Sequence, residues 1–321
     1  MKDLNIFSLI SKYRTELMGY ATLGVFICHC VLQTDFHSFI TSHLPRLVYT
    51  QGFLFLSGFG LYYSFSKDSR IFNYFKKRIY RVFFPYVLMA FPFLLIIILK
   101  THQGVEEFLG YLTTLSFWIK GSYYGMWYIP IILAMYLIFP LLYELMFKRL
   151  RGNGGGISVL ILYCLLIWSL YLFFPDYWEM NGRSLKKTVM FPLGMYCAFL
   201  SKHQVDPKWQ WSFYLSLLVF LVLTKLKFTA LFEYARSLFG IFTIPIVLLL
   251  LEINKIMPIV STSLRWLGNY SLELYLLHML IYWTAILFTS IPEVYVMLVS
   301  ILLALIICVP VHKFIGALVK L

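Results

Sequence analysis

The sequence predicts an all-α, polytopic integral membrane helix bundle, on three observations. Of the 321 residues, 61% are hydrophobic and only 13% are charged, about half the charged fraction of a typical soluble domain. The apolar residues fall in runs of roughly 17 to 22, which are long enough to cross a bilayer. The Lys and Arg residues gather at the ends of these runs, as they do at the borders of membrane spans.

About ten spans are expected, in a single domain that covers residues 1–321. They are predicted at 15–34, 44–65, 82–100, 125–147, 156–174, 187–201, 210–226, 236–252, 267–289 and 294–313. Segment 105–120 is also apolar, but Glu106, Glu107 and Gly110 favour an interfacial helix over a span. No signal-peptide cleavage site follows the first apolar run, so this span is expected to be retained.

The orientation follows from the basic residues. With the N-terminus in the cytoplasm, about two thirds of the 27 Lys and Arg residues lie in cytoplasmic segments. Both termini are therefore predicted to be cytoplasmic, which an even number of spans allows. The positive-inside rule also accounts for the net charge of +13, so nucleic acid is not an expected partner.

An ionisable residue, His29, lies inside the first span. It is 12 residues beyond Leu17, or roughly 18 Å at 1.5 Å per residue, a little past the midplane of a core about 30 Å thick. A charged group at that depth faces protein or water rather than lipid. His278 lies at a similar depth in the ninth span, five residues after Glu273. The alternative is that the two histidines only hydrogen-bond helices together.

The cysteines do not indicate a metal site. Cys28 and Cys30 flank His29, but adjacent residues on a helix point about 100° apart, so the three side chains cannot converge on one ion. None of the five cysteines forms a CxxC pair. We expect free thiols and no metal.

Three further groups could bind a ligand. Lys77, Arg78 and Arg81 lie three and four residues apart before the third span, a spacing that predicts one basic face suited to phosphate; the alternative is a flank that contacts lipid phosphate. Trp127 and Tyr128 begin the fourth span and could stack on a sugar, or could form an aromatic belt. Ser57 lies among small residues that favour close helix packing, and it could also touch a ligand.

These residues belong to a set of motifs that occur in a fixed order. They are LMGYATLGVFICH, FLSGFGLYYS, FKKRIYRVFFPY and LGNYSLELYLLH, with MWYIPIILAMYLIFPLLY between the last two. Together they resemble the membrane acyltransferase-3 family, the bacterial O-acyltransferases of surface polysaccharides. The resemblance covers residues 14 to 310.

The resemblance implies an acyl-CoA-dependent enzyme in the bacterial cytoplasmic (inner) membrane. It would transfer an acyl group, by default acetyl, from cytoplasmic acyl-CoA to a hydroxyl of a cell-surface glycan or its lipid-linked precursor. The resemblance makes His29 catalytic, assigns the CoA phosphates to Lys77, Arg78 and Arg81, and raises Glu273 to a structural or active-site carboxylate. Membrane lipid, acyl-CoA and the glycan are then the expected partners.

The motif departs from the family at one position. Most members carry an arginine eleven residues before the histidine, where this chain has Met18. Arg14 lies one helical turn earlier, on nearly the same face, and could reach the same region.

The expected mechanism is direct transfer, with His29 as general base and His278 and Glu273 beside it. An acyl-histidine relay remains open. Acyl-CoA would thread a cytoplasm-facing tunnel, lined by spans one, three and nine, that ends near His29. The alternative function is a transporter or flippase for a lipid-linked sugar, although the sequence shows no inverted repeat of the kind that such carriers contain.

Overall fold

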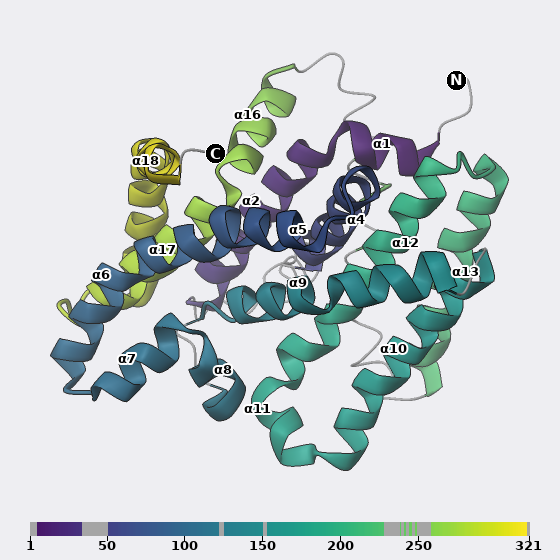
Figure 1. Cartoon of the computed structure of the whole chain (residues 1–321). Coiled ribbons are helices and arrows are strands. Elements are labelled where there is room, and N and C mark those ends of the chain that lie inside the picture. The colour runs from purple at the N-terminus through teal and green to yellow at the C-terminus, as the bar shows by residue number, and fades with distance from the viewer. Residues whose placement is uncertain are drawn as a thin grey trace.

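The computed structural model describes residues 5–33, 51–121, 125–149, 153–227 and 258–319, with five single residues between 238 and 248. Within these ranges the chain is helical and contains no strand (Figure 1). The predicted span 236–252 and the beginning of the span at 44–65 lie outside the continuously described residues. The predicted fold class is therefore confirmed as all-α.

The other predicted spans overlap helices. The helices are α1 (Ile6–Lys12), α2 (Arg14–Leu32), α4 (Gln51–Lys67), α5 (Ile71–Arg78), α6 (Phe84–Thr101), α7 (Val105–Leu112), α8 (Leu115–Lys120), α9 (Tyr128–Glu144), α10 (Asn153–Phe173), α11 (Pro175–Leu185), α12 (Met190–Lys202), α13 (Pro207–Lys227), α16 (Pro258–Asn269), α17 (Ser271–Ala285) and α18 (Glu293–Val319). The span predicted at 267–289 begins at the end of α16 and continues in α17 after a break at Tyr270.

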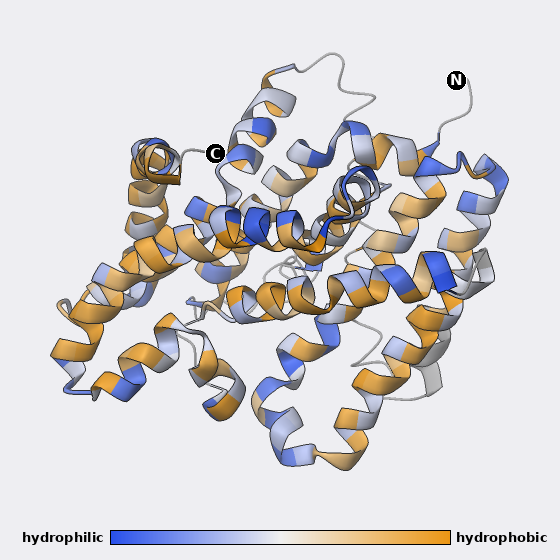
Figure 2. Ribbon diagram, in the orientation of Figure 1, coloured by the Kyte–Doolittle hydropathy of each residue, from blue (hydrophilic) through white to orange (hydrophobic). Residues whose placement is uncertain are grey.

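Among the residues that the structure describes, five helical runs are long and apolar enough to cross a membrane. They are Arg14–Leu32, Ile71–Thr101, Tyr128–Arg149, Gly154–Phe173 and Glu293–Val319. Figure 2 shows that hydrophobic residues dominate these long helices and that hydrophilic residues gather at helix ends and on α11. Several apolar helices of this length make the chain a multi-pass membrane protein. By contrast, α12 has 13 residues and α17 has 15, fewer than the 17 or so that a straight crossing needs.

The long run Ile71–Thr101 contains a π-helical segment, Ile79–Phe83, between α5 and α6. A π-turn closes hydrogen bonds between residues five apart instead of four, and such turns recur at functional sites. Each residue in it therefore rotates less about the axis than in an α-helix. Side chains before and after the segment no longer keep α-helical register.

Segment 105–120 was expected to be one interfacial helix, but it forms two short helices, α7 and α8. The break falls at Thr114, whose backbone is left-handed with φ of 69°. An ion pair between Lys120 and Glu107 joins the two helices. Leu109 and Ile119 are 50% and 68% exposed, which suits a hairpin lying on a membrane surface.

Helices α4 and α12 pack backbone to backbone. A Cβ built on Gly58 would lie 2.1 Å from the carbonyl oxygen of Phe191, and one on Gly194 would lie 2.0 Å from that of Phe55. Only glycine allows this approach. The interpretation of the small residues in FLSGFGLYYS as packing residues is confirmed, and the contact holds α4, which carries Ser57, in place.

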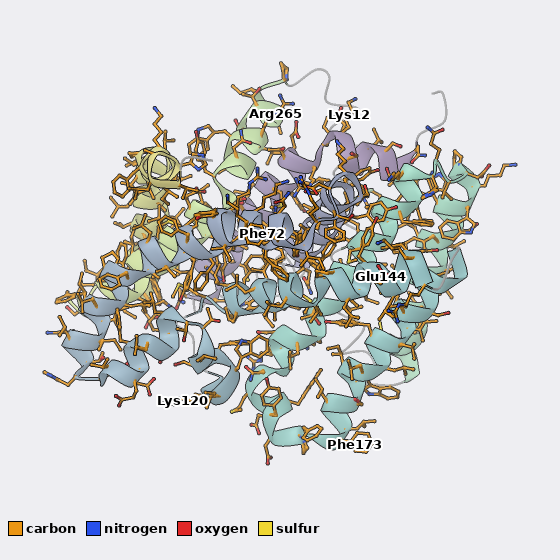
Figure 3. The ribbon with its side chains drawn as sticks, in the orientation of Figure 1. Lys12, Phe72, Lys120, Glu144, Phe173 and Arg265 are labelled. Atoms are coloured by element: carbon orange, nitrogen blue, oxygen red, sulfur yellow. The ribbon has the colours of Figure 1, made fainter. Side chains whose placement is uncertain are left out.

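Residues expected on opposite sides of the membrane lie at opposite edges of the molecule. Figure 3 places Lys12 and Arg265 at one edge and Lys120 and Phe173 at the other. The expected topology requires this separation. Lys12 and Arg265 precede spans one and nine on the predicted cytoplasmic side, whereas Lys120 lies between spans three and four and Phe173 ends span five on the predicted outer side.

Candidate active site

The two intramembrane histidines are in direct contact. Helices α2 and α17 lie side by side (Figure 1), and Nδ1 of His29 is 2.9 Å from Nε2 of His278. The rings are stacked, with centroids 5.1 Å apart. His278 is completely buried, and Phe26 packs edge-on against its ring. The two residues, which were predicted to lie at a similar depth, thus form a hydrogen-bonded pair.

The hydrogen bonds of this pair determine which ring nitrogens carry protons. Nδ1 of His278 lies 2.7 Å from the carbonyl oxygen of Leu274. A carbonyl oxygen can only accept, so Nδ1 of His278 donates and its Nε2 holds a lone pair. Nδ1 of His29 must then donate to His278. In its neutral form His29 is therefore left with the lone pair on Nε2, the atom that can take up a proton.

Glu273 does not belong to this pair. Its Oε1 lies 2.6 Å from Nδ1 of His312, and within the described ranges no hydrogen bond joins it to His29 or His278. The side chain of Glu273 is 8% exposed and that of His312 is 52% exposed. The contact joins α17 to α18. Of the two roles that the sequence left open for Glu273, structural or active-site carboxylate, the geometry therefore favours the structural one.

The three basic residues expected on one face point in different directions. Lys77 turns back toward the connection between α4 and α5, where its Nζ lies 4.0 Å from Oδ2 of Asp68. Hydrogen bonds from Arg70 and then Asn73 hold the pKa of Asp68 below its usual range, so this carboxylate stays charged. The expected single face is wrong, because the π-helical segment Ile79–Phe83 removes the α-helical register between Arg78 and Arg81.

Arg78 points into the protein. Its guanidinium lies 5.6 Å from the ring centroid of Tyr136 and 6.0 Å from that of Tyr74. Its Nε is buried and has no hydrogen-bond partner among the described residues. A buried donor of this kind is costly unless a ligand or water satisfies it, so Arg78 is poised to bind an anion.

Arg14 reaches the same region from α2. Its Nε donates to the carbonyl oxygen of Leu56, 3.2 Å away, and Arg78 and Tyr136 lie within electrostatic reach of its charge. The guanidinium fills the space beside Gly60, where a Cβ would lie 2.6 Å from the Arg14 Cζ. Although Met18 occupies the family's arginine position, a guanidinium from one turn earlier lies against α4 at Leu56 and Gly60, within electrostatic reach of Arg78.

A cavity of about 130 Å³ opens beside these arginines. Its walls come from α2, α4, the π-helical segment, α9 and α17, and the residues are Met18, Phe53, Ser57, Arg81, Val82, Tyr128, Ile132, Tyr136, Ser271, Leu272 and Tyr275. Spans one, three and nine contribute, as expected for the tunnel, and spans two and four do so as well.

The cavity stops one side chain short of the histidines. Tyr275 lines it, and the ring of Tyr275 packs edge-on against His278 with centroids 6.0 Å apart. Tyr128 packs against the other side of Tyr275 at 5.5 Å. His29 is not among the lining residues, so the ring of Tyr275 lies between the cavity and the histidine pair.

The predicted sugar-binding residues separate into two places. Ser57 hydrogen-bonds to the Tyr128 side chain, and both line the cavity on the arginine side. Trp127 instead lies under Lys187, whose Nζ is 3.9 Å from the centroid of the indole. Trp127 and Tyr128 are neighbours in sequence, but Tyr128 lines the cavity and Trp127 contacts Lys187.

Comparison with known proteins identifies the family. The family model described as an acyltransferase domain, Acyl_transf_3, matches residues 19–313. The chain belongs to the acyltransferase-3 family. Neither a curated protein nor a solved structure matches it. The resemblance drawn from the sequence motifs is confirmed, and the chain is a membrane acyltransferase in the general sense that this family defines.

This acyltransferase carries a cation near its histidines that the motifs do not include. Lys187 lies in the 3₁₀ turn Lys186–Val189, between α11 and α12, and its charge acts on Cys28 and His29. Sequence reasoning missed Lys187, although a signal exists: Arg183, Lys186 and Lys187 concentrate positive charge in a segment predicted to lie outside, against the positive-inside rule.

Proposed function

We propose that this protein transfers an acyl group, acetyl by default, from cytoplasmic acyl-CoA to a hydroxyl of a cell-surface glycan or its lipid-linked precursor, in a bacterial cytoplasmic membrane. The observation that carries the proposal is the hydrogen-bonded chain from His29 through His278 to the Leu274 carbonyl. It leaves Nε2 of His29 as a proton acceptor, and one side chain, Tyr275, separates the pair from a cavity that Arg81 lines.

The arginines suit the donor. Arg78 has a buried donor atom without a partner, Arg14 lies beside it, and Arg81 lines the cavity. Guanidinium groups bind phosphate oxygens through paired hydrogen bonds, so these three residues would hold the CoA phosphates, with Lys77 contributing only at longer range. The narrow pantetheine arm would occupy the cavity, and the ring of Tyr275 would swing aside to let the thioester reach His29.

The chemistry follows from the tautomer. Nε2 of His29 takes the proton of the acceptor hydroxyl while the hydroxyl oxygen attacks the carbonyl carbon of the thioester. The tetrahedral intermediate collapses as the carbon–sulfur bond breaks, and the CoA thiolate takes the proton back from His29. While His29 is protonated, its hydrogen bond to the neutral His278 stabilises the charge. An acyl-histidine relay would use the same lone pair as nucleophile.

The proposal is tested with purified protein in lipid nanodiscs, supplied with radiolabelled acetyl-CoA and a mixed glycan acceptor fraction. We expect labelled glycan and released CoA from the wild type, and a loss of about 10²- to 10⁴-fold for His29→Ala. His203→Ala is the matched control, because His203 is exposed at the end of α12, where its Nδ1 contacts only the Phe199 carbonyl.

Two results would contradict the proposal. Full activity in a folded His29→Ala protein would remove the histidine from catalysis and restore its role in joining helices. A wild-type protein that consumes no acyl-CoA but moves the lipid-linked sugar across the membrane would favour the transporter or flippase.

A further inference from the structure

Lys187 is not needed for the donor or for the proton transfer described above, yet it lies over Trp127 and its charge acts on His29. We propose that the acceptor carries an anionic group, a carboxylate or a phosphate, and that Lys187 binds this group while the neighbouring hydroxyl is presented to His29. The inference rests on the proposed function and names the chemical class of its acceptor.

The position of Lys187 is well defined. Its ammonium group is 3.9 Å from the centroid of Trp127, a cation–π contact that directs the side chain. The next residue, Thr188, anchors the turn: its hydroxyl donates to the Leu185 carbonyl at 2.7 Å and accepts from the Tyr163 hydroxyl at 2.8 Å. The ammonium is therefore held over Trp127 at the start of α9, and its charge acts on Cys28 and His29 near the end of α2.

The charges around Lys187 favour an anion there. Burial lowers the pKa of Lys187 to about 7, and the positive charges of Lys186 and Arg183 act in the same direction, so an anion beside Lys187 would favour its charged form. Three cations within five residues are unfavourable on the outer side of a membrane protein, where basic residues are normally depleted. Such a concentration is expected where it attracts a negatively charged ligand, because a cleft of one sign raises the local concentration of the opposite sign.

The same charge bears on catalysis. His29 becomes positive when it takes the hydroxyl proton, and the positive charge of Lys187 opposes that step. An anion bound at Lys187 would cancel this repulsion in a region of low dielectric constant, where such effects are large. An anionic acceptor would then both bind more tightly and react faster than a neutral one, and both effects would depend on Lys187.

The first test is binding, measured with His29→Ala protein in nanodiscs so that no ligand is consumed. The probes are oligogalacturonate, its neutral methyl ester, and a hexose 1-phosphate with the free hexose as its neutral counterpart. We expect at least tenfold tighter binding of one anion than of its neutral counterpart, and loss of this preference in Lys187→Gln. Preference for the uronate identifies a carboxylate, and preference for the hexose phosphate identifies a phosphate.

Two variants serve as controls. Lys187→Arg should keep the preference, since the charge is retained. Lys100→Gln is matched, because Lys100 also lies over an aromatic ring, that of Phe288, with its Nζ 5.2 Å from the centroid; it should change nothing. If neither anion binds better than its neutral counterpart, or if Lys187→Gln leaves the preference intact, the proposal is overturned.

The second test is acetyl transfer from acetyl-CoA to the preferred anion and its neutral counterpart. We expect Lys187→Gln to lower kcat/KM for the anion at least tenfold and to raise kcat for the neutral acceptor, because the charge that opposes protonation of His29 is removed. Equal losses on both acceptors would mean that Lys187 is merely structural. Charge-selective binding without any transfer would contradict the proposed acyltransferase reaction, whereas transfer without charge selectivity would contradict this inference alone.

Discussion

The two ends of the candidate site are built differently. At the arginine end, Arg78 and Arg81 come from one continuous stretch of chain, and only Arg14 is added from elsewhere. At the histidine end, His29 and its partner His278 are 249 residues apart, and Lys187 comes from a third region. In the proposed function the arginine end would bind CoA, whose phosphates do not vary, so a compact local motif would serve it. The histidine end must position a proton, and only the tertiary fold can do that.

The largest expected effect is on kcat, when the histidine end is altered. His278→Ala removes the acceptor for Nδ1 of His29, so the imidazole loses its fixed tautomer. We expect kcat to fall about 10- to 100-fold, the range typical of groups that orient a functional histidine, with KM for acyl-CoA unchanged. His278→Gln, whose side-chain oxygen can accept the same bond, should recover much of the loss. Equal activity of all three proteins would show that the pair is not part of catalysis.

The arginine end should respond in the opposite way. The double variant Arg78→Gln/Arg81→Gln should raise KM for acyl-CoA about 10- to 100-fold, since a charge-assisted hydrogen bond contributes roughly 1.5–3 kcal/mol, and should change kcat little. Lys77→Gln is the control, because Lys77 is directed to Asp68, and its effect should be below about twofold. Topology, checked by cysteine labelling, should survive. An unchanged KM would mean that this region contacts lipid instead.

The smallest expected effect tests Arg14. Gly60→Ala would place a methyl group 2.6 Å from the Arg14 Cζ, and the long side chain can shift away without unfolding the helix pair. We expect KM for acyl-CoA to rise severalfold, less than tenfold. Gly52→Ala on the same helix is the control, since its Cβ would meet only the Ala21 Cβ at an ordinary 3.5 Å. If the two variants behave alike, Arg14 lies outside the donor site.

Part of this comparison could be predicted from the sequence. Depth counting placed His29 and His278 at one level, although the count to His278 began in α16 and crossed the break at Tyr270 before α17. The spacing of Arg78 and Arg81 was visible, but their divergence was not, since a π-helical turn leaves no clear mark in a sequence. Glu273 looked equally suited to catalysis, and only the position of His312 on α18 explains its contact.

Other features could not be predicted, because they depend on contacts between distant helices. Lys187 lies in the turn before α12, and α12 is held against α4 by the close approach at Gly58 and Gly194. The contact between the rings of Tyr128 and Tyr275, beside the cavity, requires α9 and α17 to meet. The break of segment 105–120 at Thr114 likewise follows from the folded hairpin, which the Lys120–Glu107 pair joins.

The central claim is that the arginines and the histidine pair are two ends of one path for the acyl donor. The most direct measurement is a cryo-EM structure of the His29→Ala protein with a non-hydrolysable thioether analogue of acetyl-CoA. The account predicts phosphates on Arg14, Arg78 and Arg81, the pantetheine arm between Met18 and Tyr128, and Tyr275 rotated away from its place against His278. An analogue bound elsewhere, or bound with its acyl end still sealed from position 29 by Tyr275, would contradict it.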